Sequence, residues 1–435
     1  MTRTTRNSNR VQPSQSTTRL QVQGRTNKVD CALLNDDFDA LPYTKRRKLK
    51  RAPYSSVSMQ PLLLDLGKLL RGTLVKRPSA VIKSPYVADV SLLDAGGKIT
   101  TVKAESSTTT TLLAHAPALD VGGMCVVGSE IYLSERSGEG KTSHSIELVR
   151  GAPLGSVGST NEEGGVLVGA HPRLGELIAE EVLKLGLLRE ALPLKCGFRL
   201  GPVNDFKTSK KKDTANKNEV PKKDDFTGDQ PQNITTAHDT IISNASSEQK
   251  VSLSQQVTLG DSRVDFQITL TQHDLKNSSI SISHRVVFEV KNVVCADYES
   301  GTEPIPSGPG DCVIVAPASN GTSSNDRKGY QRSALFPWGR IRGQKFEGRS
   351  VVSERACKHL RNLQSLLDED DVTPVVLFIV NRSDCESARA CREKCPVFAE
   401  ILEDVVRSGV KALAVRVRWT DEGKCFFDGI IPVHV

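Results

Sequence analysis

The chain has 435 residues, of which 37% are hydrophobic and only 5% are aromatic. This length exceeds what one hydrophobic core usually covers, so we expect two domains plus segments that belong to no core. The formal net charge is +7, but residues 1–51 alone hold twelve Lys or Arg against four Asp. The excess charge therefore lies in the tail, which excludes a uniformly basic body. Any anion-binding surface on the body must be a local patch.

Ten cysteines are scattered along the chain with no CxxC pair and no preceding signal peptide, so we expect reduced thiols and no disulfide framework. Cys385, Cys391 and Cys395 lie close together, but their spacing fits no zinc pattern and no histidine stands nearby. The longest apolar run, PVVLFIV at 374–380, has the length of a strand. We therefore expect a soluble protein with no membrane partner.

Residues 1–55 are rich in Arg, Ser, Thr, Asn and Gln and lack apolar periodicity, which predicts a disordered basic tail. The run KRRKLKR at 45–51 is typical of a nuclear import signal, so we expect a nuclear protein. The first 29 residues contain no acidic residue and fit a mitochondrial or plastid transit peptide equally well. The third interpretation is a solvated tail that carries no targeting signal.

Residues 60–160 hold short β-branched runs separated by turn residues, which predicts a small antiparallel sheet or barrel. Lys76, Arg77 and Lys83 flank its first two strands. Basic side chains in such places can follow a phosphate backbone, so Lys76 and Arg77 are candidate DNA-binding residues. The alternative, which fits equally well, is that these residues only protect an exposed sheet edge from pairing with another strand.

Residues 165–435 alternate between helical and strand patterns. A helix RLGELIAEEVLKLGLL, which carries Glu181, precedes the strands VDFQITL and RVVFEVKNV. A helix from Ser353, the strand PVVLFIV, a helix from Pro396 to Ser408 and the strand KALAVRVRW follow. This order predicts a mixed sheet flanked by helices, hence an α+β protein. Two polar segments, about 203–250 and 298–332, are predicted to be disordered insertions.

Charged residues interrupt two of these strands. In the run 286–291, alternate apolar residues form one face and Glu289 and Lys291 the other. If SRVDF lies on the neighbouring strand, Asp265 sits beside Glu289, and two adjacent carboxylates repel each other unless a divalent cation lies between them. Oxygen ligands suit Mg²⁺ or Mn²⁺, while Lys291 would hold a water or a developing charge. The alternative is an ordinary solvated strand face.

The helix glutamate, the two strand carboxylates and the lysine follow the pattern of PD-(D/E)xK nucleases. Asp265, Glu289, Lys291 and Glu181 are then the candidate catalytic residues, with Asp265 and Glu289 as metal ligands. Two functions fit this pattern. One is a metal-dependent deoxyribonuclease, and the other is a DNA-binding regulatory protein that keeps the scaffold without turnover.

Seven collinear blocks resemble the sugar fermentation stimulation protein A family between about 68 and 433. They are LVKRPSAVIKSPYVADVSL, SRVDF, FEVKNV, ALFP, VSERACKHLRNL, VVLFIVNRSD and SGVKALAVRVRW. The resemblance implies an OB-like barrel followed by a PD-(D/E)xK nuclease-like domain that binds DNA. It also implies that Asp265, Glu289 and Lys291 occupy the motif positions and Glu181 the position of the helix glutamate.

The chain departs from the family in three places. The family's CPNTGSM reads APALDVGGM at 116–124, TERG reads SERA at 353–356, and an insertion GRIRGQKFEGR occupies 339–349. The acidic motif stays intact, but the family's DNA contacts cannot be carried over at these places. The N-terminal extension and the insertions indicate a eukaryotic-type member. Homo-oligomerisation stays open.

Overall fold

The computed structural model describes residues 60–93, 111–117, 121–137, 140–151, 165–194, 197–207, 249–259, 262–273, 281–303, 313–316 and 330–435. These residues belong to one compact unit, Met59–Val435. The predicted basic tail, including the run 45–51, and most of both predicted insertions lie outside the described residues. Among the residues that are described, no helix is both long and apolar enough to cross a membrane.

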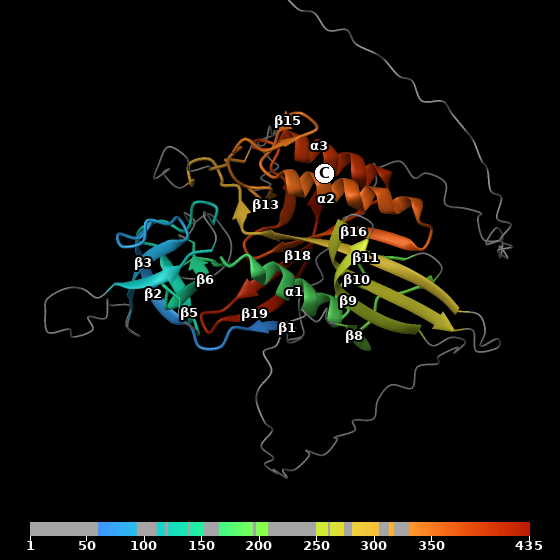
Figure 1. Ribbon diagram of the computed structural model, residues 1–435, viewed down its shortest axis with the longest axis horizontal. Helices are drawn as coiled ribbons and strands as arrows, with labels where there is room; N and C mark the ends of the chain where they lie inside the picture. Colours follow the sequence, from blue (N-terminus) through green and yellow to red (C-terminus); the bar gives the residue numbers. More distant parts are fainter. Residues whose placement is uncertain are drawn as a thin grey trace, which may run out of the picture. The chain divides into compact units, whose positions relative to one another are not determined.

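A small barrel comes first in the chain. Its strands are β2 (Leu70–Lys76), β3 (Val87–Leu92), β4 (Leu112–His115), β5 (Glu130–Glu135) and β6 (His144–Arg150), with β7 (Leu167–Gly169) paired to β6. β2 pairs with both β3 and β5, and β4 pairs in parallel with β6, so five strands close in the order β2-β3-β4-β6-β5. Figure 1 draws it in blue to teal. The predicted OB-like barrel is confirmed.

An eight-stranded sheet forms the rest of the scaffold. Its strands are β1 (Leu62–Asp65), β8 (Asp205–Lys207), β9 (Gln249–Leu259), β10 (Ser262–His273), β11 (Ser281–Val293), β16 (Val372–Val380), β18 (Lys411–Trp419) and β19 (Lys424–Ile431). Their order is β1-β19-β18-β16-β11-β10-β9-β8. β9, β10 and β11 run antiparallel, whereas β16 and β18 continue in parallel from β11. The predicted mixed sheet is confirmed, with β1, β8, β9 and β19 as strands that the sequence did not predict; β8 lies in the segment 203–250 that was predicted to be disordered.

Helices cover both faces of this sheet (Figure 1). They are α1 (Arg173–Lys184), α2 (Glu354–Ser365) followed by a 3₁₀ turn (Leu366–Asp368), and α3 (Pro396–Ser408). Val286 and Phe288 of β11 pack in the core under α1, while Val287 packs in the core under α2 and α3. Both faces of β11 are therefore buried, which removes solvent from the strand that carries the charged residues.

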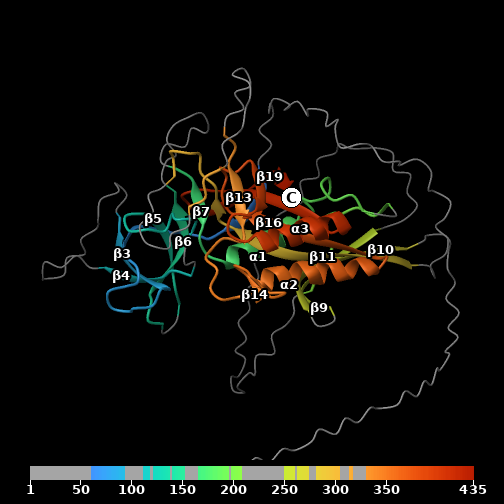
Figure 2. The same ribbon diagram turned by 90° about the horizontal axis from the view of Figure 1, so that it is seen from above.

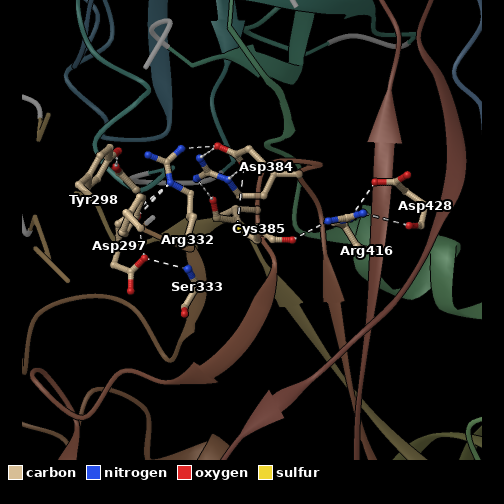
Figure 3. A network of polar contacts seen from close by, with 12 residues as sticks. Asp297, Tyr298, Arg332, Ser333, Asp384, Cys385, Arg416 and Asp428 are labelled. Atoms are coloured by element: carbon tan, nitrogen blue, oxygen red, sulfur yellow. Dashed lines mark hydrogen bonds and ion pairs between the residues drawn. The ribbon is translucent and has the colours of Figure 1, made fainter. Parts of the chain in front are cut away.

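A smaller sheet lies beside the large one. It consists of β12 (Cys295–Ala296), β13 (Ser333–Phe336), β17 (Ser387–Ala390) and β20 (Val433–His434), and a separate hairpin joins β14 (Lys345–Phe346) to β15 (Arg349–Ser350). Figure 3 shows a buried charge network here, in which Asp384 accepts hydrogen bonds from the guanidinium groups of Arg382 and Arg332. Burial alone would raise the pKa of Asp384, but these two charges hold it well below its usual range.

Candidate functional site

The ladder between β10 and β11 ends at Asp265. Paired residues run from Phe266 with Phe288 to His273 with Ser281. Beyond this point the carboxylate of Asp265 replaces the backbone pairing, because its Oδ2 accepts a hydrogen bond from the amide of Val290 at 2.7 Å. The carboxylate is thereby held against the middle of β11, beside the residues that the sequence singled out.

Glu289 and Lys291 lie together on the α2 side of β11. Only 3% of Glu289 and 7% of Lys291 is exposed, and Lys291 Nζ donates to Glu289 Oε1 at 2.6 Å. Asp265 is 9% exposed. The interpretation of these residues as a solvated strand face is therefore wrong, because helices cover both faces of the strand. Charges buried to this degree are costly unless they are paired, so they need an explanation.

His359 of α2 is a site residue that the sequence did not predict. Its Nδ1 contacts Glu289 Oε1, and Arg355 Nε donates to its Nε2 at 3.2 Å. Since a guanidinium group can only donate, Nε2 is the acceptor and Nδ1 carries the proton that Glu289 accepts. The 3.4 Å approach of Lys291 Nζ to the same Nδ1 is then a contact between two donors rather than a hydrogen bond. His359 follows Ser353, the confirmed N-cap of α2, by six residues. The sequence signal that could have identified it is a polar residue next to the buried residues of this helix.

The two carboxylates titrate differently. Burial, followed by the charge of Glu289, raises the pKa of Asp265 to about 6, although the hydrogen bond from Val290 opposes this. Burial alone would also raise the pKa of Glu289, but His359 and Lys291 outweigh it and lower that pKa. The site thus holds one stabilised anion beside one weak acid, and the mutual repulsion of the two carboxylates is a main reason for the difference.

Helix α1 presents Glu176 to this site. Its negative charge is among the causes of the raised pKa of Asp265. Glu181 instead pairs with Lys184 at 2.9 Å, and the two glutamates lie about 140° apart around the helix axis. The structure therefore brings together Asp265, Glu289 and Lys291, whereas Glu181 makes no contact with them among the described residues, and Glu176 is the α1 glutamate whose charge acts on Asp265.

The position of α1 depends on Gly175. A Cβ atom at this residue would lie 2.6 Å from the Cβ of Asn292 on β11, far inside van der Waals contact. Only glycine lets the first turn of the helix lie this close to the strand. Because Glu176 follows directly, this close approach also sets the distance between its carboxylate and the strand residues.

The donor set fits a divalent cation with a partly aqueous shell. Lys291 and His359 contact Oε1 of Glu289, and Val290 contacts Oδ2 of Asp265. Glu289 Oε2 and Asp265 Oδ1 make no hydrogen bond within the described residues. No group of three or more His, Cys, Asp or Glu arranged to hold a metal occurs there either. Two carboxylates supplemented by water are the ligands that Mg²⁺ prefers.

The candidate DNA-binding residues of the barrel differ from each other. Lys76 ends β2 and is exposed. Arg77 donates from Nε to the carbonyl oxygen of Pro85 at 2.9 Å and contacts Cys125 Sγ with Nη1 at 3.6 Å. The guanidinium group of Arg77 therefore already has partners in the barrel, whereas Lys76 remains accessible. DNA binding by either residue stays a prediction.

A family model, described as the sugar fermentation stimulation protein RE domain, matches residues 350–423. Proteins named sugar fermentation stimulation protein homologue are similar over comparable lengths of the chain. The homologue of Rippkaea orientalis is 38% identical over 73 residues, 17% of this chain and 29% of that protein. Over residues 350–423 this chain is similar to the sugar fermentation stimulation protein family.

A second relative has a similar level of identity. The homologue of Pseudomonas syringae pv. tomato is 36% identical over 84 residues, 19% of this chain and 35% of that protein. The chain thus spans about a third of the length of these relatives. SfsA of Pyrococcus furiosus, solved in complex with Ca²⁺, is 14% identical and covers 86% of this chain and 100% of its own, with a TM-score of 0.45. The segment matched by the family model contains His359 and begins after the strands that carry Asp265 and Glu289.

Proposed function

We propose that this protein is a divalent-metal-dependent nuclease that hydrolyses phosphodiester bonds in DNA. The observation that carries the proposal is the buried pair of Asp265 and Glu289, in which burial, followed by the charge of Glu289, raises the pKa of Asp265 to about 6. Two like charges held together inside a fold lower its stability, so the arrangement is expected where a cation offsets the repulsion.

Each residue then has a role. Asp265 Oδ1 and Glu289 Oε2 would hold Mg²⁺ or Mn²⁺, which supplies charge neutralisation and an acidified water when bound. Lys291, held by Glu289 Oε1, places an ammonium group beside this position, where it can orient the attacking water or stabilise the charge that develops on the phosphate. His359 orients Glu289 by donating to the same oxygen, and is a positioning residue.

A cleavage assay tests the proposal. Purified full-length protein is incubated with linear, nicked and single-stranded DNA in Mg²⁺, Mn²⁺ or EDTA. We expect cleavage with either cation and none in EDTA, and none by Glu289→Gln under any condition. Cleavage that persists in EDTA, or in the Glu289→Gln variant, would show that another site or a contaminant is responsible.

The second candidate function is DNA binding without turnover. It is favoured by the absence, among the described residues, of a three-residue metal cluster, and by the fact that Glu289 already has two partners. In that case the parent protein and the Glu289→Gln variant would bind DNA equally well and leave it intact with every cation.

A further inference from the structure

A group of basic side chains lies next to the candidate site, on α2 and on the segment before it. We call Arg342, Lys345, Arg355 and Lys358 the basic surface. All four side chains are exposed. Arg342, Lys345 and Lys358 form no ion pair within the described part of the chain. Since the chain beyond residue 51 has almost no net charge, such a group is a local feature.

The hairpin that carries part of this surface is firmly attached. Gln344 accepts a hydrogen bond from the amide of Glu354 through Oε1 at 2.9 Å and one from the amide of Val351 through its carbonyl at 3.0 Å. Val351 is fully buried in the core under α2, and Phe346 packs against the same core. Figure 2 shows β14 at the N-terminal end of α2. The cationic groups are therefore presented from an ordered element.

The basic surface is connected to the candidate site through α2. Arg355 donates to His359, and His359 donates to the buried carboxylate of Glu289. Lys358 follows Arg355 by three residues, so both side chains lie on one side of the helix. A phosphate bound at Arg355 would thus be linked to Glu289 through the side chains of Arg355 and His359.

Neighbouring arginines do not contribute to this surface, because carboxylates neutralise them. Arg349 pairs with Glu400, and Arg361 pairs with Asp404. The four cations of the basic surface share the hairpin and the first turns of α2 with two exposed carboxylates, Glu347 and Glu354, so positive charge is in excess there. Separate exposed cations on the hairpin and the adjoining helix suit a polyanion with spaced single charges.

We propose that the basic surface binds the phosphodiester backbone of a DNA strand and leads it toward Asp265 and Glu289. This inference rests on the proposed function, since it names the surface that would deliver the substrate to the same site. Arg342 and Lys345 belong to the insertion at 339–349, so this half of the basic surface lies outside the blocks that carry the resemblance.

The test is DNA binding without cleavage. Fluorescence anisotropy with a short labelled duplex, in EDTA and over a series of NaCl concentrations, compares the parent with the double variant Arg342→Glu, Lys345→Glu. We expect the affinity at low salt to fall tenfold or more, and the slope of log affinity against log salt to decrease by about 2, because each lost phosphate contact removes about 0.9. The matched control is the double variant Arg407→Glu, Lys411→Glu, which changes one exposed charge in the last turn of α3 and one at the start of β18. This control should bind DNA like the parent.

Unchanged affinity and salt slope in the hairpin variant would overturn the inference, as would an equal loss in the control. Circular dichroism and melting temperature verify that both variants are folded. Failure of the proposed function gives a different result. If the parent binds DNA through the hairpin but never cleaves it, the inference about the basic surface stands and the proposal of catalysis is wrong. If the parent cleaves DNA and the hairpin variant binds and cleaves equally well, only the inference about the basic surface is wrong.

Discussion

Asp265, Glu289 and Lys291 are three buried charges on two neighbouring strands. Lys291 and His359 compensate Glu289, whereas Asp265 has one backbone amide and an adjacent negative charge. In a site without a cation, the buried charge of Asp265 is therefore the one that lowers the stability of the fold most. This asymmetry leads to a measurable pH dependence.

In metal-free protein, Asp265→Asn should stabilise the fold more at pH 7 than at pH 4. The pKa of Asp265 is raised from 3.8 to about 6, so the folded protein binds a proton more tightly than the unfolded chain between these values. This contribution to stability is complete below about pH 4 and is lost as the pH rises through 6, by about 3 kcal/mol in all. Denaturant titrations of parent and variant in EDTA at both pH values measure it. An equal difference in the free energy of unfolding at pH 4 and pH 7 would contradict it.

Lys291→Ala should separate cation binding from turnover. The two carboxylates remain, so the cation should still bind, but the ammonium group that would stabilise the developing charge is gone. We expect the cleavage rate to fall by about 100-fold or more, and Lys291→Arg to recover part of it. Single-turnover cleavage and a calorimetric cation titration on each variant decide the matter. A cleavage rate that does not change would exclude Lys291 from the reaction.

At the level of elements, the register of α1 decides which acidic side chain reaches the site. Gly175 holds the first turn against β11, and Glu176 follows it. Glu176→Gln should weaken cation binding and slow cleavage, because a negative charge near Asp265 is lost. Glu181→Gln should leave both unchanged, because Glu181 pairs with Lys184. Equal effects of the two substitutions would contradict the observed register.

The elements themselves could largely be predicted. Ser353 as N-cap of α2 and the span Pro396–Ser408 for α3 follow from local capping rules, and both are confirmed. The strand β9 was missed because its sequence QKVSLSQQVTL is mostly polar, and only the neighbouring β10 makes it a strand. Glu176 and His359 were missed because their roles depend on how two helices pack on β11, which no local pattern contains.

On the scale of the whole molecule, the barrel and the large sheet share a core. Tyr132 and Leu148 of the barrel belong to the same hydrophobic cluster as Ile178 of α1. The amide of Gly169 donates to the carbonyl of Asn381 at 2.9 Å. The boundary near residue 160 that the sequence predicted stays a prediction, but these contacts make separate unfolding of the two parts unfavourable.

We therefore expect the described unit to unfold in one cooperative transition. Leu148→Ala should destabilise it as a whole by about 2–5 kcal/mol, because the side chain is fully buried in the shared core. Differential scanning calorimetry of both proteins measures this as one peak that moves to a lower temperature. Two peaks in the parent, with only one of them shifted by the substitution, would mean that the barrel and the sheet unfold independently.

The most direct test of the metal site is calorimetric titration of the full-length protein with Mn²⁺, in parallel for the parent, Asp265→Asn, Glu289→Gln and Glu181→Gln. If Asp265 and Glu289 share one cation, the parent should bind Mn²⁺, both strand variants should lose this binding, and Glu181→Gln should retain it. Binding of equal affinity in all four proteins, or no binding in the parent, would contradict a metal site between β10 and β11.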